Sequence, residues 1–418
     1  MNLFDDFLQR GLIQDHTDPN GIRGHLDAGM VTFYVGFDPT AASLHVGSLV
    51  QLLMARRLQL AGHRPLLLVG GATGLIGDPS GRSSERELNS PEVVAGWVER
   101  IRAQVAPFVA YDGDNGAVLV NNLDWTARLS AVEFLRDVGK HFPVNRMLAR
   151  EVVKARLETG ISFTEFSYQL LQAHDFYELH RRHGCTLQFG GSDQWGNITA
   201  GVDYIRRRGV GPVHAFTTPL VTKADGTKFG KSETGSVWLD RELTSPYAFY
   251  QFWINVDDRD VVPYLRYFSF RDQDELAELE KATSERPATR AAQRALAEEL
   301  TGLVHGAAEC AQVIAASQAL FGRGDLRDLS RATLRSALVE AGLTYVEELP
   351  SAAVLLRETG LVSSFSEARR AVAEGGAYLN NERVLDSDAV VSSSALLHGR
   401  WLVLRRGKRR VAGVEVPR

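Results

Sequence analysis

The sequence predicts an α/β protein whose first part holds a parallel sheet, followed by a helix-rich part and a small α+β tail. Residues 31–37 (VTFYVGF) and 64–74 (RPLLLVGGATG) are almost continuously apolar, as expected of strands buried on both faces. Between them, residues 44–62 carry apolar side chains at helical spacing and end in a glycine. A strand, a helix and a strand in this order are typical of a parallel sheet with helices on its faces.

The rest of the first domain continues this alternation. A helix is expected at residues 91–110 and a strand at 116–122. A mostly helical stretch is expected at 127–180, and a strand that runs into a loop at 186–197. A further helix is expected to follow, and the domain is expected to close near residue 225. Ligands of such sheets bind at the carboxyl ends of the strands. The loops after residues 37 and 70 are therefore the first candidates for a site.

The second half of the chain changes character twice. Residues 245–325 carry long helical patterns, which predicts a helical domain. The tail combines short helices with strand-like segments, and the Asn380-Asn381 pair between apolar residues predicts a turn that joins two strands. The segment between these parts shows no strong periodicity and is expected to be a connector. The expected organisation is a first domain at 1–225, a second at 226–325, a linker at 326–350 and a third domain at 351–418.

Composition excludes several classes of protein. The chain has 418 residues, 44% hydrophobic and 23% charged, which excludes a disordered protein and allows two or three domains. Its net charge of −4 excludes a chain that is basic throughout. Two cysteines, Cys185 and Cys310, cannot form a disulfide framework or a four-thiolate zinc site, which favours the reducing cytosol. We expect neither a signal peptide at the N-terminus nor a membrane span.

Charge is distributed unevenly along the chain. Residues 351–418 contain 11 Lys and Arg against 7 Asp and Glu, so this tail is basic on an otherwise acidic chain. A small basic module on an acidic body is typical of a protein that binds a polyanion. On charge alone, a solvated surface is an equally good interpretation.

Two short motifs combine glycines with groups that bind phosphate. Residues 45–47 (HVG) follow the first strand and open a helix, where unpaired N–H groups and the helix dipole favour an anion. Residues 228–232 (KFGKS) place two lysines three apart on a turn-rich loop, which can close over a triphosphate and neutralise the charge on leaving pyrophosphate. Taken singly, each motif has a simpler interpretation: a surface histidine beside a packing glycine, and a solvated loop.

Three further segments place polar groups together. Residues 77–86 (GDPSGRSSER) offer an aspartate for an ammonium and arginines for phosphate. Residues 190–197 (GGSDQWGN) set glycines beside acidic and amide side chains, an arrangement that suits a ribose diol and a carboxylate. In residues 168–176 (YQLLQAHDF), three polar side chains spaced four and three apart fall on one helical face, like the floor of a pocket. Each segment also has a simpler structural interpretation. Residues 77–86 could be a surface turn, residues 190–197 a loop whose tryptophan lies in the core, and residues 168–176 an ordinary amphipathic helix.

Together, these segments resemble the class I aminoacyl-tRNA synthetases and, within that family, the bacterial tyrosyl-tRNA synthetases. HVG with the preceding Pro39-Thr40 is similar to the family's first signature, and KFGKS is similar to its second. YVGFDPTAASLHVG, GDPSGRSSER, YQLLQAHDF and GGSDQWGNITAG resemble segments of the tyrosine enzymes in the same order. The resemblance covers essentially the whole chain, including a tail similar to an S4 domain.

Both signatures depart from the family pattern. Ser48 stands where the first signature usually ends in a second histidine or an asparagine-like group. Phe229 and Gly230 stand in place of the methionine and serine that are common in the second signature. The second variant is one that the tyrosine enzymes tolerate.

The resemblance implies a Rossmann-like catalytic domain with a helical insertion, a helical anticodon-binding domain and a small α+β S4-like RNA-binding domain. It implies that tyrosine and ATP form tyrosyl-adenylate and pyrophosphate, and that the tyrosyl group then passes to the 3′ end of tRNA(Tyr). Mg²⁺ is expected with ATP, and no protein-bound structural metal is expected. The family is a cytoplasmic homodimer, and the apolar segment 142–153 would pack either between subunits or in an ordinary core.

The resemblance also implies roles for individual residues. Those implied to bind tyrosine are Tyr34, Asp78, Tyr168, Gln172, Asp175 and Gln194, with Tyr34 and Asp175 on the phenolic hydroxyl. Those implied to line ATP are Gly36, Asp38, His45, Gly47, Gly191, Asp193 and Lys231. Those implied to act on the phosphates in catalysis are Thr40, His45, Arg82, Arg86, Lys228, Lys231 and Ser232. Those implied to contact tRNA are Arg405, Arg406, Lys408, Arg409 and Arg410.

Three alternative functions are compatible with parts of the pattern. A tryptophan--tRNA ligase shares the fold, but Tyr34 and Asp175 argue against it. A synthetase-like RNA-binding protein without catalysis is disfavoured by intact Thr40, His45 and signature lysines. A dinucleotide-binding dehydrogenase would need a GxGxxG sequence after the first strand, and the sequence has none there.

Overall fold

A computed structural model describes residues 2–80, 88–150, 153, 154, 156, 160–227, 229–232 and 235–417, without the side chains of residues 231 and 232. The chain divides into two compact units, one of Met1–Asp240 with Val262–Leu276 and one of Arg241–Val261 with Ala277–Arg418. Within the described ranges, no helix is both long and apolar enough to cross a membrane.

The first unit is built on five parallel strands in the order β3-β2-β1-β4-β5. The strands are β1 (Thr32–Phe37), β2 (Arg64–Val69), β3 (Val118–Asn121), β4 (Leu187–Gly191) and β5 (His214–Thr218). This arrangement confirms the predicted parallel sheet. The strand order reverses direction between β1 and β4, and ligands of such sheets bind outside the carboxyl ends of the strands at that reversal.

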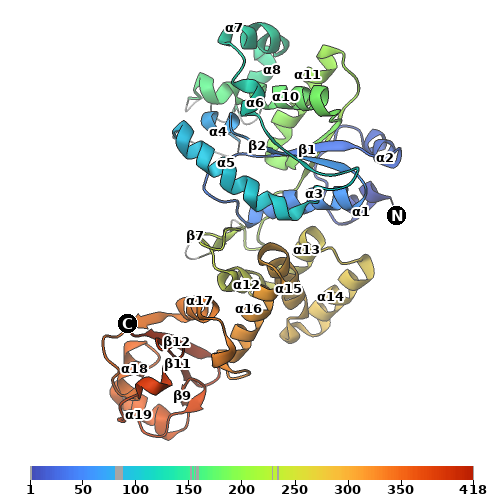
Figure 1. The fold of residues 1–418 in the computed structure, drawn as a ribbon. Helices are drawn as coiled ribbons and strands as arrows, with labels where there is room; N and C mark the ends of the chain where they lie inside the picture. Colours follow the sequence, from blue (N-terminus) through green and yellow to red (C-terminus); the bar gives the residue numbers. More distant parts are fainter. Residues whose placement is uncertain are drawn as a thin grey trace. The chain divides into compact units, whose positions relative to one another are not determined.

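Helices cover both faces of this sheet (Figure 1). Because β–α–β crossovers are right-handed, α3 and α5 lie on one face, and α10 and α11 lie on the other. The helical segments of this unit are α1 (Leu3–Gln9), α2 (Pro19–Asp27), η1 (Val46–Ser48), α3 (Leu49–Leu60), α4 (Thr73–Ile76), α5 (Pro91–Val105), η2 (Ala106–Phe108), α6 (Leu123–Thr126), α7 (Ala131–Glu133), η3 (Phe134–Val138), η4 (Gly139–His141), α8 (Val144–Leu148), α10 (Phe163–His183), η5 (Ser192–Gln194) and α11 (Trp195–Arg208). Two short antiparallel strands follow, β6 (Lys231–Ser232) and β7 (Gly235–Ser236).

Helix α10 has clear local reasons to begin and end where it does. The Ser162 side chain accepts a hydrogen bond from the backbone N–H of Glu165, which caps the first turn. The helix ends at Gly184, whose φ of 64° lies in the left-handed region that glycine adopts at little cost. One face of α10 packs on β1, where the rings of Phe176 and Tyr34 lie 5.4 Å apart. Tyr34 is therefore buried between the sheet and α10.

The second unit combines helices with a mixed sheet. Its helical segments are α12 (Pro246–Ile254), η6 (Pro287–Thr289), α15 (Ala291–His305), α16 (Ala307–Ala319), η7 (Leu326–Asp328), α17 (Arg331–Ala341), α18 (Ala352–Glu358), α19 (Phe365–Ala373) and η8 (Ser393–Ala395). Helices α13 (Asp258–Phe268) and α14 (Gln273–Glu285) have residues in both units. The helical character predicted for residues 245–325 is confirmed.

The sheet of the second unit has the order β10-β9-β11-β12-β8, and its pairs are antiparallel except for β12 with β8. Its strands are β8 (Leu343–Tyr345), β9 (Ala377–Leu379), β10 (Glu382–Arg383), β11 (Trp401–Arg406) and β12 (Arg410–Glu415). Asn380 and Asn381 join β9 to β10 with φ values of 47° and 69°. Two consecutive positive φ angles are what a tight hairpin turn requires, so this prediction is confirmed.

Residues 326–350, expected to be a connector, contain a helix and a strand. Helix α17 buries Thr333, Leu334, Ala337 and Leu338 along one side. Strand β8 has three residues and obtains its partner from β12, about seventy residues further on in the sequence. Local periodicity misses both, because the helix spans only three turns and the strand depends on a distant segment.

Candidate active site

Predicted site residues meet at the carboxyl edge of the first sheet, where its strand order reverses. Gly36 in β1 is exposed, and a side chain there would find one atom within 4 Å, Leu68 Cδ2 at 3.7 Å. Gly191 ends β4 on the other side of the reversal. Gly36 therefore leaves open space beside the backbone, which is the space that a flat ligand needs, whereas a Cβ on Gly191 would lie 2.5 Å from Asp193 Oδ1.

Asp175 forms the buried end of the site. Its Oδ1 accepts a hydrogen bond from Trp125 Nε1 at 2.8 Å, and its Oδ2 accepts one from Asn122 Nδ2 at 2.9 Å. Burial raises the pKa of Asp175 to about 8, and the two hydrogen-bond donors only partly offset this by acting to lower the pKa. The carboxyl group is thus held in a fixed orientation in a place that water does not reach.

Tyr34 lies beside this carboxyl group and is 2% exposed. Within the described chain, the Tyr34 hydroxyl makes no hydrogen bond of normal geometry. Gln188, which pairs with Tyr34 from strand β4, acts to lower the pKa of Tyr34. Burial and the charge of Asp175 dominate and raise the pKa of Tyr34 well above its usual value. A buried hydroxyl without a partner is costly, and a second hydroxyl placed between Tyr34 and Asp175 would relieve that cost.

A hydrogen-bonded network connects this buried end to the end of β1. Tyr168 Oη donates to Asp38 Oδ2 at 2.5 Å, and Thr73 Oγ1 donates to Asp38 Oδ1 at 2.6 Å. Asn122 Nδ2 also donates to Thr73 Oγ1 at 3.0 Å, so the network continues to Asp175. A side chain on Gly70 would overlap Asp38 and Thr73, which explains the glycine there. The network fixes Asp38 before any ligand arrives.

A second polar cluster lies between the ends of β2 and β4. Gln194 Nε2 donates to Asp78 Oδ2 at 2.6 Å and to Asp193 Oδ2 at 3.2 Å. Asn197 Nδ2 donates to Gln194 Oε1 at 3.2 Å. Burial, with a smaller effect of Asp78, raises the pKa of Asp193. Two carboxyl groups held together in this way suit a cationic group such as an ammonium.

Two further predicted residues, Gln172 and Thr40, lie close in sequence to members of the network. Gln172 lies one turn after Tyr168 on α10 and is half-buried. Thr40 is exposed, and its backbone N–H donates to Asp38 O at 2.9 Å. Both therefore border the space around the network rather than form part of it.

His45 is held by its own helix start. Its Nδ1 accepts a hydrogen bond from the backbone N–H of Gly47 at 3.0 Å, which places the proton of the neutral ring on Nε2. A side chain on Gly47 would place Cβ 2.6 Å from His45 Cε1. The glycine thus makes room for the imidazole, and Nε2–H is the donor that this arrangement offers to a phosphate.

The two signature segments lie side by side. Val46 N–H donates to Val237 O, and Val237 N–H donates to Gly230 O, each at 3.0 Å. Gly230 has a φ of 75°, and a Cβ on it would lie 3.0 Å from Val46 Cγ2. The adjacency of the HVG and KFGKS segments, about 180 residues apart in the sequence, is therefore a property of the fold. Lys231 and Ser232 follow Gly230 directly as strand β6.

Phe229 anchors the second signature to helix α13. Its ring stacks on Phe268 at 5.8 Å and meets Tyr264 edge-on at 5.1 Å. Tyr264 Oη also donates to Thr222 O at 3.0 Å. Helix α13 thus contacts Phe229 of the second signature through two side chains, Tyr264 and Phe268. Arg82, Arg86 and Lys228, also expected in the site, lie outside the described residues.

Comparisons with known proteins show the family of the chain. The family model of class I tRNA synthetases (W and Y) matches residues 27–322, and that of the tyrosine--tRNA ligase SYY-like C-terminal domain matches residues 336–412. The tyrosine--tRNA ligase of Streptomyces griseus is 63% identical over 418 residues, which cover 99% of each chain. The chain belongs to the tyrosine--tRNA ligases. The enzyme of Acidothermus cellulolyticus is 62% identical with the same coverage.

Solved structures of this family share the fold. The C-terminally truncated mitochondrial tyrosyl-tRNA synthetase of Aspergillus nidulans matches with a TM-score of 0.69 and 32% identity, over 77% of this chain and 94% of that chain. The tyrosyl-tRNA synthetase of Archaeoglobus fulgidus, complexed with L-tyrosine, matches with a TM-score of 0.57 and 17% identity, over 74% of this chain and 99% of that one. The predicted family resemblance is confirmed.

Sequence reasoning missed four residues of the candidate site: Asn122, Trp125, Thr73 and Asn197. Asn122 and Trp125 lie just after strand β3, which ends at Asn121, and Thr73 lies just after strand β2, which ends at Val69. Since ligands bind at the carboxyl ends of such strands, position alone could have selected them. Asn197 lies within the GGSDQWGN segment, but the sequence does not say which of its side chains point inward.

The basic tail residues divide into two groups. Arg405 is 9% exposed and donates to Gly407 O at 2.7 Å, and Arg406 forms an ion pair with Glu367 at 2.7 Å. Arg410 Nη2 donates to Gly360 O at 2.9 Å. Lys408 and Arg409 are exposed in the turn between β11 and β12. Three of the five predicted tRNA contacts thus also hold the tail's own backbone or carboxylates.

Proposed function

We propose that the chain activates L-tyrosine with ATP and transfers the tyrosyl group to tRNA(Tyr). The observation that carries this proposal is the buried Tyr34 and Asp175 pair, beside the adjoining signature segments at the same sheet edge. The pair offers an acceptor and an unpartnered hydroxyl to a phenol. The sheet edge and signature segments offer space and donors to a nucleotide.

The first step needs positioning rather than a protein nucleophile. A carboxylate oxygen of tyrosine forms a bond to the α-phosphorus of ATP, while the bond from that phosphorus to pyrophosphate breaks and its electrons leave with pyrophosphate. A terminal ribose hydroxyl of tRNA then attacks the tyrosyl carbonyl, and AMP leaves. Because the carboxylate is already nucleophilic, alignment and charge stabilisation account for the rate.

Charge on the leaving pyrophosphate would be stabilised by the first signature and by the cationic residues near the second. His45 supplies a fixed Nε2–H, Gly47 leaves room for the His45 imidazole, and Gly36 leaves room for the nucleotide. We assign Thr40, Arg82, Arg86, Lys228, Lys231 and Ser232 to the phosphates. Mg²⁺ would enter with ATP; the described residues include no group of three or more His, Cys, Asp or Glu that could hold a metal.

The amino acid end would select tyrosine by its hydroxyl. Phenylalanine would leave Tyr34 Oη and one acceptor position of Asp175 unpaired in a buried place. Asp78, with Tyr168 and Gln172, would hold the ammonium, and Gln194 would lie near the reacting carboxylate. The tyrosine would thereby be bound at both ends with its carboxylate directed toward ATP.

Pyrophosphate exchange tests this function directly. Incorporation of labelled pyrophosphate into ATP is expected with tyrosine and not with phenylalanine or tryptophan. Exchange with tryptophan alone would favour the tryptophan ligase. Loss of exchange with all three amino acids, while tRNA binding persists, would favour an RNA-binding protein without catalysis.

We also propose that the active form is a homodimer. Several large apolar side chains are exposed between residues 131 and 163, including Val132 at 72%, Val144 at 59% and Phe163 at 73%. Such exposure is typical of a protein interface. Val144→Asp with Phe163→Asp should shift sedimentation from dimer to monomer, whereas Leu60→Asp, at a 70% exposed residue on α3, should not. A monomeric wild-type protein would refute this assembly.

The remaining domains would serve tRNA. The helical part at 226–325 would bind the anticodon arm, and the tail at 351–418 would act as an S4-like module. Lys408 and Arg409 are its best phosphate contacts because they are exposed. A ligase that works on tRNA with ATP would act in the cytoplasm.

A further inference from the structure

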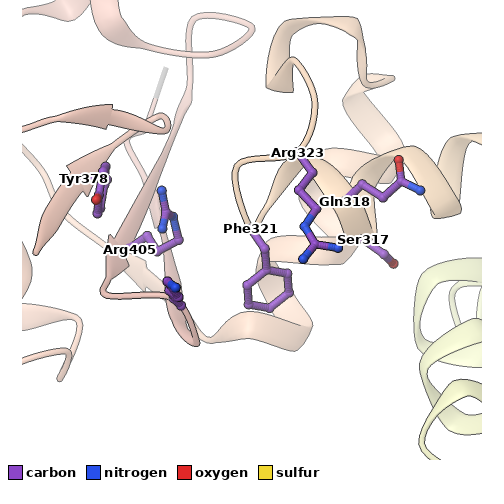
Figure 2. A pocket seen from close by; sticks show the side chains of 7 residues that line it. Ser317, Gln318, Phe321, Arg323, Tyr378 and Arg405 are labelled. Carbon is purple, nitrogen blue, oxygen red and sulfur yellow. The ribbon is translucent and has the colours of Figure 1, made fainter. Parts of the chain in front are cut away.

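A cavity of about 570 Å³ in the second unit lies between the end of α16 and the sheet (Figure 2). Three of its seven lining side chains are cationic, namely Arg323, Arg405 and Lys408. This charge suits the tRNA that is already proposed to bind this unit, so the cavity indicates no separate function. Contacts around the first signature in the first unit, by contrast, have no role among those assigned above.

Gln104 is a polar residue on the apolar face of helix α5. The other residues on this face are buried or half-buried, and they are Val94, Trp97, Val98, Ile101 and Val105. Gln104 is itself half-buried, and a polar side chain in such a place is costly unless it forms hydrogen bonds. The groups that bind Gln104 therefore indicate why a glutamine stands on this face.

Gln104 binds the segment just before the first signature. Its Oε1 accepts a hydrogen bond from the backbone N–H of Leu44 at 2.9 Å, and the Ser43 hydroxyl lies 3.2 Å from the same oxygen. Ser43 and Leu44 are 4% and 7% exposed, so water cannot readily replace this acceptor. Ser43 Oγ also accepts a hydrogen bond from the backbone N–H of Asp240 at 3.2 Å. Gln104 thus fixes the backbone one residue before His45.

The same stretch of backbone is paired with the segment that follows the second signature. Leu239 N–H donates to Leu44 O at 2.9 Å, and His45 faces Trp238 in an isolated antiparallel bridge. The His45 and Trp238 rings meet edge-on, with their centres 6.3 Å apart. This pairing extends the contact between the two signature segments. Leu44 is therefore held on both sides, by Gln104 through its N–H and by Leu239 through its carbonyl.

We propose that Gln104 is a positioning residue for adenylate formation and acts through His45. Its side chain fixes the N–H of Leu44, and hence the place where the chain enters the helix start that holds His45. A shift of the backbone there moves His45 Nε2 relative to the phosphates, and a misplacement of about 1 Å can slow a reaction by roughly a hundredfold. This role rests on the proposed function, and it gives Gln104 no contact with a ligand.

Gln104→Met in the full chain tests this role, because methionine keeps the length of the side chain and removes the acceptor. Single-turnover kinetics should show that tyrosyl-adenylate forms about tenfold more slowly, with an unchanged dissociation constant for tyrosine. Gln104→Glu retains an acceptor oxygen and should keep the wild-type rate. Equal slowing in Gln104→Glu and Gln104→Met, or a wild-type rate in Gln104→Met, would overturn the proposal.

Gln59→Met is the matched control for a loss of stability. Gln59 Oε1 also accepts a hydrogen bond from a backbone N–H, that of Ala110 at 2.8 Å, and Gln59 is 8% exposed. It lies in the last turn of α3, about 15 Å along the helix from its start. Both variants should lower the midpoint of urea unfolding, but only Gln104→Met should slow adenylate formation. Equal slowing in the two variants would mean that Gln104 acts through stability, and the proposal would fail.

A double-mutant cycle separates positioning of His45 from an independent effect. If Gln104 acts through the imidazole, adding Gln104→Met to His45→Ala should slow adenylate formation by less than about twofold further. A further loss of about tenfold would show that the two residues act independently, which contradicts the proposal. A wild-type rate in His45→Ala itself would count against the proposed role of His45, whereas a slow His45→Ala beside a normal Gln104→Met would count against Gln104 alone.

Discussion

The two ends of the active site are built in opposite ways. At the amino acid end, Tyr34, Asn122 and Asp175 are at most 2% exposed, and Asp175 is fixed by two hydrogen bonds before any ligand arrives. At the phosphate end, Thr40 and His45 are exposed, and Gly36 leaves open space beside the backbone. The first end is preorganised by burial, and the second by backbone geometry.

This difference separates selectivity from rate. A buried polar pair discriminates strongly, because a wrong ligand leaves it unpaired. Exposed donors at a helix start discriminate little between nucleotides but can stabilise charge that develops on phosphate. Substitutions at the buried end should therefore affect tyrosine binding, and those at the open end should affect the rate of adenylate formation.

The largest effect is expected from Asp175→Ala. This change removes the acceptor for the phenol, leaves Trp125 Nε1 without its partner and removes one of the two acceptors of Asn122 Nδ2. We expect kcat/KM for tyrosine in pyrophosphate exchange to fall by at least about a thousandfold, roughly 4 kcal/mol. Trp125→Phe, which removes one donor and keeps the acceptor, should lose much less. Activation near the wild-type level by folded Asp175→Ala would refute the assignment.

His45→Ala should come next and should affect only the rate. Removing one donor to a transition-state phosphate costs about 3 kcal/mol, so adenylate formation should slow by roughly a hundredfold. Equilibrium dialysis should give an unchanged dissociation constant for tyrosine. If pre-steady-state kinetics showed comparable losses in tyrosine binding and in the rate of adenylate formation, the two ends of the site would not act independently.

Asp175 should also make stability depend on pH. The unfolded carboxyl loses its proton near pH 4, whereas the folded one keeps it up to about pH 8, so the unfolded state binds fewer protons in this range. Stability relative to Asp175→Asn should therefore fall by on the order of 1 kcal/mol per pH unit as pH rises from 4 to 8. Urea unfolding of both proteins at several pH values measures this slope. A difference that is independent of pH would mean that Asp175 is ionised in the folded chain.

Gly47→Ala should have the smallest effect. Its Cβ would meet the His45 ring at 2.6 Å and displace it, although the imidazole remains. Adenylate formation should slow by about tenfold, less than in His45→Ala, since an off-rotamer side chain costs on the order of 1 kcal/mol. Gly96→Ala on α5, where a Cβ meets nothing within 4 Å, is the control and should leave the rate unchanged.

The sequence predicted those parts of the fold and site that depend on local pattern. β1 and β2 are apolar runs, and the Asn380-Asn381 turn has a residue pair that accepts positive φ. The motif residues Asp78, Tyr168 and Asp175 belong to the networks described above.

Contacts between distant segments could not be predicted in the same way. Asn122 and Asp175 are separated by 53 residues, and nothing in the local pattern of either names the other. The strand within residues 326–350 could not be predicted for a similar reason, because β8 exists through its pairing with β12. Arg406 was chosen for its charge, but its ion pair with Glu367 depends on tertiary packing.

A crystal structure of the chain with a non-hydrolysable tyrosyl-adenylate analogue would show directly which groups meet the two ends of the ligand. We expect the phenolic oxygen to lie within hydrogen-bonding distance of Tyr34 Oη and the Asp175 carboxyl group. We also expect the phosphate to lie on the side of His45 and the second signature. An analogue bound with its phenol away from Asp175, or with its phosphate remote from His45, would contradict this assignment of the two ends.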